Sequence, residues 1–353
     1  MTNTIADIEE ADVILVTGSN TTENHPVLSS FMKRAVLKGT KLYLIDPRRV
    51  GLADHADKWL RPTPGTDIAW INGLMNVIIS EGLQDQKFID ERTEDFQAAK
   101  AVIEKYTPEH VQELTGIPAD DLREVAREFA KAGAASICYC MGITQHTCGT
   151  DNVKSLANLS MLCGHLGKRG GGVNPLRGQN NVQGACDMGG LPNVFTAYQP
   201  VTSDEARQGY EKAWGVTGMS PSPGLVATEM FQKAHEGEMK SLFIIGENPM
   251  VSDPDLNHAR KALENLEFLV VQDIFQTETS ALADVVFPAF CFAEKNGTFT
   301  NSERRIQRIR KAVDPPEGVR RDWEILCQIA SCMGHEMAYE NAHEIFKEIT
   351  AVT

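Results

Sequence analysis

The chain has 353 residues and a formal net charge of −14, from 34 Lys+Arg against 48 Asp+Glu. This length predicts about two domains, and the acidic balance argues against nucleic acid as a partner. No run of about 18 apolar residues occurs, which excludes a helical membrane span. The polar, acidic start is not a secretory signal, so we expect a cytoplasmic location.

The eight cysteines include no C-x-x-C pair. This excludes a zinc ribbon or a local run of iron–sulfur ligands within the chain. Without a secretory signal a disulfide framework is not expected. We therefore expect most of the cysteines to be buried and reduced.

The first half begins with the pattern strand, polar loop, helix, strand. Residues 11–18 predict a strand that ends at a glycine, 27–38 a helix that stops at Gly39, and 41–48 a strand that ends around Asp46. This order is typical of parallel sheets. Further elements follow: a helix with Thr66 or Asp67 as N-cap, a mostly helical stretch over 85–133, a strand over 135–142 and a helix over 151–167.

A glycine- and amide-rich stretch then interrupts this pattern. Residues 168–190 hold seven glycines in 23 residues, with a single acid, Asp187. Such a composition does not suit a helix or a central strand. Long loops of this kind are functional or disordered, and the low charge favours a loop that lines a ligand site.

The second half returns to alternating strands and helices. The pattern predicts strands over 241–249, 268–275 and 281–289, a helix over 224–238, a helix over 255–266 capped by Asp253, and closing helices over 321–334 and 342–350. A second parallel sheet is therefore expected between about 180 and 320. The fold class is α/β: two Rossmann-like lobes, 1–179 and 180–353, with mainly parallel sheets flanked by helices and joined by a Gly/Asn/Gln-rich loop.

The two halves share one motif. ILVTGSNTTE leads to YLIDPRR in the first half, and LFIIGENPM leads to LVVQDIF in the second. The loop after each first strand can receive a phosphate on backbone N–H groups, and the acid after the next strand can bind ribose hydroxyls. Each glycine is also compatible with a plain turn. Neither half contains G-x-G-x-x-G, which argues against a nicotinamide-dependent Rossmann enzyme.

RGQNNVQGACDMG, residues 177–189, resembles the segment of molybdenum- or tungsten-dependent formate dehydrogenases that carries the substrate arginine. MGITQHTCGTDNV and GHLGKRGGGVNPLRG fit the same enzymes. GSNTTENHP, IDPRR, GENPM, VVQDIF, DVVFPA and EKNGTFTNSERRIQ resemble motifs of the wider dimethyl-sulfoxide-reductase superfamily of molybdopterin oxidoreductases. The likeness extends over nearly the whole chain.

The chain departs from that family at both ends. A four-cysteine iron–sulfur domain, the cysteine or selenocysteine that ligates the metal, and a C-terminal pterin-binding barrel are not found in it. The resemblance therefore implies the central part of a catalytic (alpha) subunit, which we expect not to oxidise formate alone. It implies oxidation of formate to CO2 at a Mo or W bis(molybdopterin guanine dinucleotide) centre, a 4Fe-4S cluster in the full-length protein, and an electron-accepting subunit with iron–sulfur or flavin centres.

Arg177 is the residue on which the resemblance to formate dehydrogenase depends most. A guanidinium is a planar, permanently charged fork that suits a small carboxylate, and the resemblance implies that Arg177 orients formate. The alternative is an arginine that satisfies loop carbonyls. Gln179, Asn180 and Gln183 either bind pterin edges or pin the loop.

The resemblance also implies cofactor contacts on both halves. Asp67 is expected to read guanine donors through its carboxylate, or else to act only as a helix N-cap. Met141 and Gln145, expected at the end of their strand, resemble pterin contacts, and Lys295 is either a phosphate partner or a solvated lysine. The complete set is Ser19, Asn20, Glu23, Asp46, Arg48, Asp67, Met141, Gln145 and Gln179 in the first half, and Gly246, Asn248, Asp273, Lys295 and Asp322 in the second.

Two histidines and a basic run are expected to be structural. We expect His25 to cap a turn before Pro26 and His146 to bond the backbone, and the run 304–311 to form a solvated face. Two alternatives for the whole protein stay open. One is another molybdopterin oxidoreductase of the nitrate-reductase type, against which Arg177 argues. The other is a non-catalytic pterin-fold subunit of an electron-transfer complex.

Overall fold

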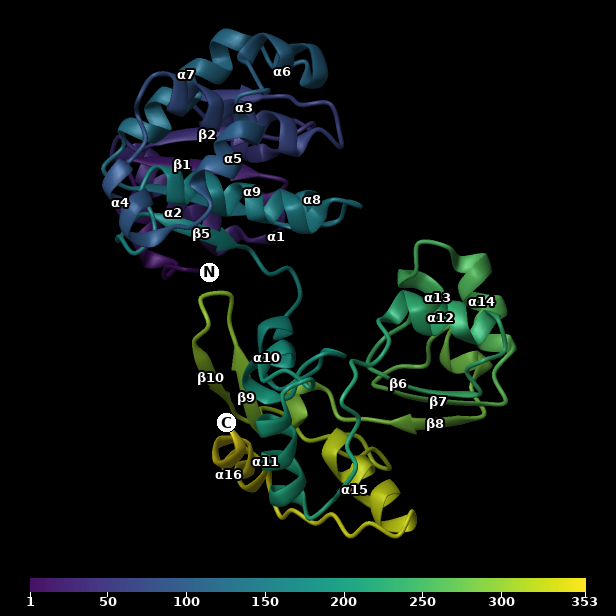
Figure 1. Ribbon diagram of the computed structural model, residues 1–353. Coiled ribbons are helices and arrows are strands. Elements are labelled where there is room, and N and C mark those ends of the chain that lie inside the picture. The colour runs from purple at the N-terminus through teal and green to yellow at the C-terminus, as the bar shows by residue number, and fades with distance from the viewer. The chain divides into compact units, whose positions relative to one another are not determined.

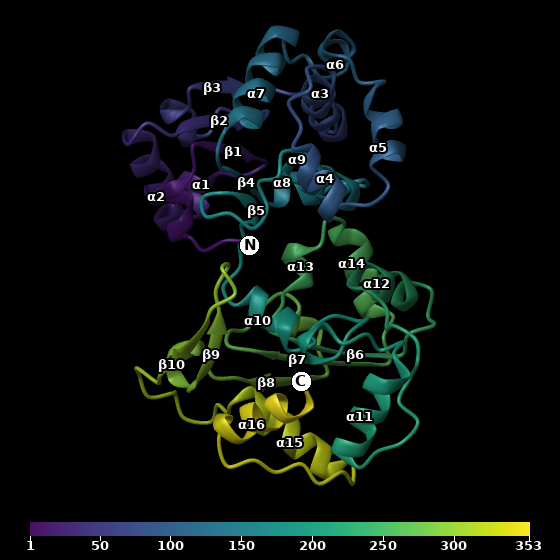
Figure 2. The same ribbon diagram turned by 60° about the vertical axis from the view of Figure 1, so that its left-hand side comes forward.

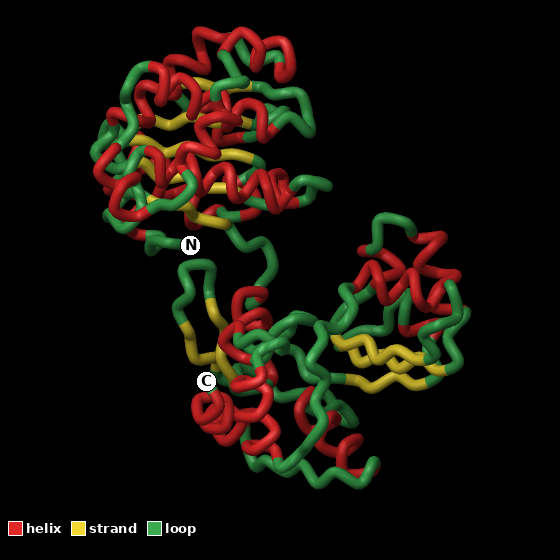
Figure 3. Tube along the Cα trace, viewed as in Figure 1, coloured by secondary structure: helices red, strands yellow, loops and turns green.

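The computed structural model describes all 353 residues and divides into two compact units (Figures 1 and 3). Unit 1 comprises Met1–Asn180 together with Ser302–Arg305, and unit 2 comprises Asn181–Asn301 together with Ile306–Thr353. None of the helices combines the length and apolarity that crossing a bilayer requires.

Unit 1 is built on a five-stranded, fully parallel sheet with the strand order β3-β2-β1-β4-β5. Its strands are β1 (Val13–Thr17), β2 (Lys41–Ile45), β3 (Lys58–Leu60), β4 (Ala135–Tyr139) and β5 (Gly172–Pro175). The chain first adds strands on one side of β1 and then crosses to the other side. The pair β1 and β4 is therefore the topological switch point of this sheet.

Helices cover both faces of the first sheet. They are α1 (Thr21–Asn24), α2 (Pro26–Leu37), α3 (Asp67–Ser80), α4 (Gln86–Arg92), α5 (Phe96–Ile103), α6 (Pro108–Thr115), α7 (Ala119–Lys131), α8 (Met141–Thr144) and α9 (Gly149–Leu162), with the 3-10 helices η1 (Ala6–Glu10) and η2 (Gly51–His55). Every residue of β1 is buried. Leu15 packs toward α3, α7 and α9, and Ile14 packs toward α2. A strand covered on both faces reads as a continuous apolar run, as VILVT does.

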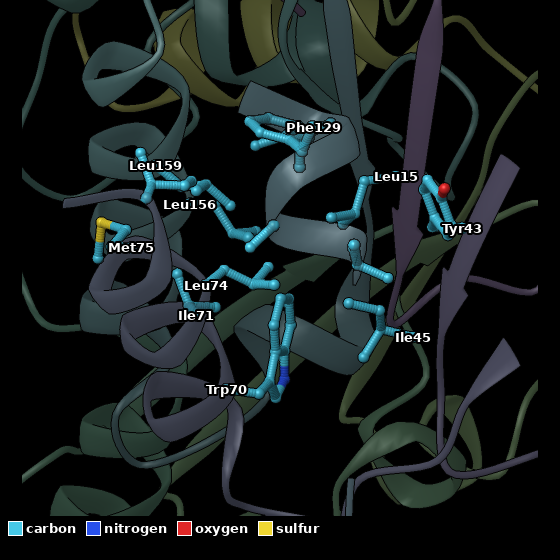
Figure 4. Packing of buried hydrophobic residues seen from close by; sticks show 14 of the residues in the cluster. Leu15, Tyr43, Ile45, Trp70, Ile71, Leu74, Met75, Phe129, Leu156 and Leu159 are labelled. Carbon is cyan, nitrogen blue, oxygen red and sulfur yellow. The ribbon is translucent and has the colours of Figure 1, made fainter. Parts of the chain in front are cut away.

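The larger core cluster lies between the sheet and α3. Figure 4 shows Trp70, Ile71 and Leu74 of α3 facing Leu15 and Ile45 of the sheet. None of these five side chains is more than 1% exposed. Helix α3 is buried on nearly all sides, and this packing holds it against the strands whose ends carry the polar loops described below.

Unit 2 contains a smaller parallel sheet in the order β6-β7-β8, formed by β6 (Ser241–Ile245), β7 (Phe268–Asp273) and β8 (Val285–Pro288). One face packs on the core formed with α12 (Ala227–His235) and α14 (Leu256–Glu264). The other carries Phe243, Ile245 and Phe268, which are 38–47% exposed. The second parallel sheet predicted from the sequence is confirmed, but its helices cover only one face fully.

The remaining elements of unit 2 are helical, apart from one hairpin. The helices are α10 (Val182–Asp187), α11 (Asp204–Trp214), α12 (Ala227–His235), α13 (Pro249–Ser252), α14 (Leu256–Glu264), α15 (Asp322–Cys332) and α16 (Ala342–Val352), with η3 (Thr196–Tyr198), η4 (Ser280–Leu282) and η5 (Phe292–Glu294). Figure 2 shows the antiparallel hairpin of β9 (Gly297–Thr300) and β10 (Ile306–Ile309), which is separate from the three-stranded sheet. Strand β10 lies within the basic run, and Arg308 and Arg310 in it are exposed.

The structure corrects the expectation that residues 168–190 form only a loop. This stretch contains the edge strand β5 and the short helix α10. Gly172 suits the strand because a Cβ there would lie 2.2 Å from the Thr2 hydroxyl oxygen, and its φ is +90°. The N-cap of helix α10 is Asn181, whose φ of 59° is one that asparagine tolerates.

One predicted cap and one cysteine expectation were also wrong. Asp255, not Asp253, caps α14, with its carboxylate accepting from the His258 N–H at 3.1 Å. Asp253 instead accepts from the Asp255 N–H at 2.8 Å, an Asx turn just before the helix. Of the two N-cap candidates for α3, Thr66 and Asp67, the structure has Thr66 at that position. All eight cysteines are free, but only four are buried.

Candidate functional site

The carboxyl ends of β1 and β4 approach each other unusually closely. The Gly142 N–H donates to the Gly18 carbonyl at 3.0 Å, and a Cβ on Gly18 would lie 2.7 Å from the Gly142 carbonyl carbon. Gly18 also has a φ of +56°. Only glycine meets both conditions, so the two backbones converge at the switch point, where open α/β sheets bind ligands.

The loop after β1 is rich in buried polar atoms that lack a partner. Six of the fourteen such side-chain atoms in the chain lie between residues 17 and 25. They belong to Thr17, Ser19, Asn20, Thr21, Thr22 and His25. Ser19 is only 4% exposed. Buried polar groups in folded proteins normally find hydrogen-bond partners, so this concentration indicates a place built for a polar ligand.

Arg177 follows β5 at the same edge of the sheet. Its backbone carbonyl lies 2.9 Å from the His25 Nε2, whereas its side-chain Nε is buried without a partner. Its positive charge opposes the rise that burial causes in the pKa of Tyr139, at the end of β4. The alternative that Arg177 satisfies loop carbonyls finds no support at Nε, and the side chain is available to an anion.

Asp46 and Arg48 continue this edge after β2. Asp46 is 7% exposed and accepts a hydrogen bond from the Arg48 backbone N–H at 2.8 Å. Burial raises the pKa of the Asp46 carboxyl, and the charge of Asp67 adds to the rise. The Arg48 side chain is exposed. A buried acid beside a free arginine can accept from hydroxyl groups and bind phosphate, respectively.

Asp67 is the first residue of α3, and its carboxylate contacts other side chains rather than capping the helix. Its carboxylate accepts from the Trp70 indole N–H at 3.2 Å and lies 3.6 Å from the His146 Nε2. Burial raises the pKa of Asp67, and the Trp70 and His146 interactions partly offset that rise. The His146 Nε2 is also 2.9 Å from the Gly142 carbonyl, so the predicted backbone contact of this histidine is confirmed.

The other residues predicted in unit 1 are exposed. Met141 and Gln145 do not end β4, which stops at Tyr139; they begin and follow the short helix α8. The chain turns there because Gly142 must approach Gly18. These exposed residues at the same edge are Glu23, Met141, Gln145 and Gln179.

In the corresponding loop of unit 2, the polar side chain of Asn248 already has hydrogen-bond partners within the unit. Gly246 ends β6 with a φ of +66° and open space around it. The Asn248 amide donates to Glu278 at 2.8 Å and holds the pKa of that carboxyl below its ordinary value. The Asn248 oxygen accepts from the Thr279 hydroxyl at 2.7 Å. This asparagine therefore positions the 277–280 turn.

Lys295 and Asp322 form an ion pair with each other. Asp322 also accepts from the amide of Gln272, a fully buried residue of β7, at 2.9 Å. Asp273, at the end of β7, accepts from the Ile274 N–H at 2.6 Å. Lys295 is thus paired within the protein rather than merely solvated.

The structure also reveals contributors that sequence reasoning assigned elsewhere or missed. His25 is the C-cap of α1, in the turn before Pro26 as expected, and its side chain also reaches the Arg177 carbonyl. Gln183 pins its own segment by donating to Asp187 at 2.7 Å. The Cys140 thiol donates to the Leu176 carbonyl at 2.9 Å, which fixes the approach to Arg177. The polar run directly after β1 is a local signal for a ligand loop. The contacts of Cys140 and His25 join residues 36 and 152 positions apart, which no local pattern indicates.

Comparisons with known proteins identify the family and the fold. The family model described as molybdopterin oxidoreductase matches residues 1–332. The F420-dependent formate dehydrogenase subunit alpha of Methanocaldococcus jannaschii is 52% identical over all of this chain and 52% of its own length. Formate dehydrogenase H of Escherichia coli is 42% identical over 99% of this chain and 49% of its own length.

The chain thus spans about half the length of the curated relatives it matches. Among solved structures, acetylene hydratase from Pelobacter acetylenicus shares the fold, with a TM-score of 0.78 at 21% identity over 99% of this chain and 52% of its own. The family model, the whole-chain identities and the fold all agree. The chain belongs to the molybdopterin oxidoreductase family.

Proposed function

We propose that the chain is the central part of the catalytic subunit of a formate dehydrogenase, which oxidises formate to CO2. The observation that carries the proposal is the Arg177 side chain, whose Nε is buried and unpartnered at the switch-point edge of the first sheet. Whole-chain relatives at 42–52% identity named formate dehydrogenases support it.

In this proposal Arg177 binds the formate carboxylate. Its planar fork can hold both oxygens at once, which leaves the C–H bond pointing away from the guanidinium. Oxidation of formate to CO2 releases one proton and two electrons. The buried surroundings of the Arg177 Nε strengthen the charge interaction by excluding water.

Family membership implies a molybdopterin cofactor, and the residues of unit 1 fit one. The unpartnered atoms of Ser19 and Asn20 would receive its polar groups, and Asp46 and Arg48 would bind ribose and phosphate. When bound, the metal–pterin group supplies the acceptance of two electrons. The other residues proposed for contact in unit 1 are Glu23, Asp67, Met141, Gln145 and Gln179.

A second dinucleotide would be held by unit 2, in a bis(molybdopterin guanine dinucleotide) form with Mo or W. Gly246, Asn248 and Asp273 would line it. Lys295 and Asp322 would have to exchange their ion pair for contacts with phosphate and guanosine. We also propose that residues 1–179 and 180–353 are the two domains that hold these halves.

Electrons would leave through a 4Fe-4S cluster of the full-length protein to a partner subunit with iron–sulfur or flavin centres. The names of relatives at 50–52% identity point to F420 as the final acceptor. A cytoplasmic location belongs to the same proposal.

The test is the full-length subunit with Arg177→Lys, assayed for formate oxidation with a dye acceptor. Loss of the bidentate fork should lower kcat/KM about 100-fold, since hydrogen bonds to charged groups are worth about 1.5–3 kcal/mol. Arg169→Lys is the matched control, because Arg169 is a largely exposed surface arginine earlier in the same segment. Unchanged activity in Arg177→Lys, or nitrate reduction without formate oxidation in the wild type, would contradict the proposal.

A further inference from the structure

His25 lies between two helices, and its backbone is fixed on both sides. Its N–H donates to the Thr21 carbonyl at 3.0 Å, and its carbonyl accepts from the Ser29 N–H at 2.9 Å. Pro26 follows and rigidifies the start of α2. The imidazole is therefore presented from a rigid corner of the loop after β1.

The Nε2 of His25 lies 2.9 Å from the carbonyl oxygen of Arg177, a residue 152 positions later in the sequence. A carbonyl oxygen can only accept, so the hydrogen must be on Nε2. The Nδ1 of the neutral ring is then an acceptor, and it is buried without a partner. This tautomer is set by the contact with Arg177 and by no other protein group.

The hydrogen bond from His25 is the last of three anchors along this part of the chain. The Leu176 N–H donates to the Tyr139 carbonyl at 2.8 Å, and the Leu176 carbonyl accepts from the Cys140 thiol at 2.9 Å. Directly after Arg177, residues 178–180 are exposed. Without His25, the Arg177 peptide would be the first of a solvated segment, free to rotate about ψ.

We propose that His25 is a positioning residue for Arg177. By holding the Arg177 carbonyl it fixes the backbone from which the guanidinium projects, while the side-chain Nε stays free for the substrate. The inference rests on the proposed function, in which Arg177 binds formate. It assigns His25 a role beyond its turn, because nothing in the turn uses the imidazole.

The test compares His25→Leu with His25→Gln in the full-length holoenzyme. The glutamine amide retains an N–H donor near the Nε2 position, whereas leucine keeps the bulk and removes the donor. Loss of one anchoring hydrogen bond should raise the KM for formate about 10-fold and leave kcat within about threefold, because the affected interaction is present both before and during the reaction. The KM of His25→Gln should stay within about threefold of wild type.

A second readout does not depend on activity. Trypsin cleaves after arginine, and cleavage requires the local chain to open. The bond between Arg177 and Gly178 should be cut about 10-fold faster in His25→Leu than in wild type or His25→Gln, as measured by mass spectrometry. Cleavage after the exposed Arg169 should be the same in all three proteins and serves as the internal control.

Equal KM values and equal cleavage rates in wild type and His25→Leu would overturn the proposal. So would identical defects in His25→Leu and His25→Gln, since the donor would then not be what matters. If His25→Leu does not accumulate with normal metal content, His25→Met takes its place. Failure of the wild type to oxidise formate would refute the proposed function, while the cleavage rates would still decide whether His25 anchors Arg177.

Discussion

The two units contain the same succession of elements but use it differently. In unit 1 the order is β1, α1, α2, β2, and in unit 2 it is β6, α13, α14, β7. Each first strand ends at a glycine with positive φ, Gly18 or Gly246, and each second strand is followed by or ends in an aspartate. The order of secondary-structure elements and the residues at the strand ends are thus nearly the same in the two units.

The difference lies in what stands beside the first strand. Strand β1 pairs with β2 on one side and β4 on the other, whereas β6 is the edge of its sheet and pairs only with β7. A Cβ at Gly18 would therefore collide with the backbone of Gly142, whereas a Cβ at Gly246 would meet open space. Open α/β sheets bind ligands where two connections diverge at adjacent strand ends, and only the first strand of unit 1 has a neighbouring strand on each side.

The polar atoms follow that difference. After β1 they are buried and unpartnered, whereas after β6 the Asn248 amide already binds Glu278 and Thr279. The two cations that the sequence singled out differ in the same way. Arg177 has an unpartnered buried Nε, and Lys295 is paired with Asp322. A polar motif is therefore informative about ligand binding only once its internal partners are known.

The largest effect that tests this comparison is expected from Leu15→Ala against Phe243→Ala. Both residues lie three positions before the strand-end glycine, but Leu15 is fully buried and Phe243 is 38% exposed. Leu15→Ala should lower the free energy of unfolding by about 2–5 kcal/mol. Phe243→Ala should cost less than about 1 kcal/mol, as measured by urea denaturation. Equal losses in the full-length protein would mean that another segment covers the open face of β6.

Gly18→Ala against Gly246→Ala is expected to give the next largest difference. Alanine at either glycine meets an unfavourable positive φ, at a cost of about 1 kcal/mol. Only at Gly18 does the added Cβ also collide with the Gly142 backbone, which should add about 1–3 kcal/mol. Calorimetric melting of both variants measures the gap. Equal melting temperatures would show that the close approach of β1 and β4 does not constrain the fold.

The smallest effect concerns pH and the Asp67 carboxyl. Burial raises its pKa above the ordinary value of 3.8, so ionisation opposes folding, and this penalty grows as pH rises from about 3.8 through the folded-state pKa. Asp67→Asn keeps an acceptor for Trp70 and removes the penalty. The variant should gain stability relative to wild type as pH rises from 3.5 to 7, by less than about 1 kcal/mol.

The measurement for Asp67→Asn is urea denaturation at several pH values, with the exposed Asp120→Asn as the control. A pH dependence that is identical in wild type and Asp67→Asn would contradict the assignment. It would mean that the His146 contact compensates fully for burial.

Much of the fold was predictable because apolar runs and strand-end glycines are local signals. The strands over 11–18, 241–249 and 268–275 were found from composition and from flanking turns. Strand β5 and helix α10 were not predictable in this way. Glycine in β5 allows a close approach of another segment, and asparagine before α10 is a left-handed N-cap, and neither role is visible in a local pattern. The cap of α14 was missed by two residues because Asp253 and Asp255 have the same chemistry.

The candidate site divides in the same way. Ser19, Asp46 and Arg177 were predicted from their places after strands and from resemblance, and their cofactor and substrate roles stay proposals. His25 was predicted to be a turn residue, since its contact partner lies 152 residues away. No local pattern can report a contact at that separation.

The sequence by itself determined the α/β class, the order of elements and the chemistry available at each strand end, because these depend on periodicity and residue type over a few neighbouring positions. The tertiary structure alone decided which strand ends adjoin, and therefore which polar groups lose their partners. Adjacency in a parallel sheet depends on crossover connections and long-range packing. That is why the loop after β1 contains buried polar atoms without partners, whereas Asn248 after β6 is already bonded to Glu278 and Thr279.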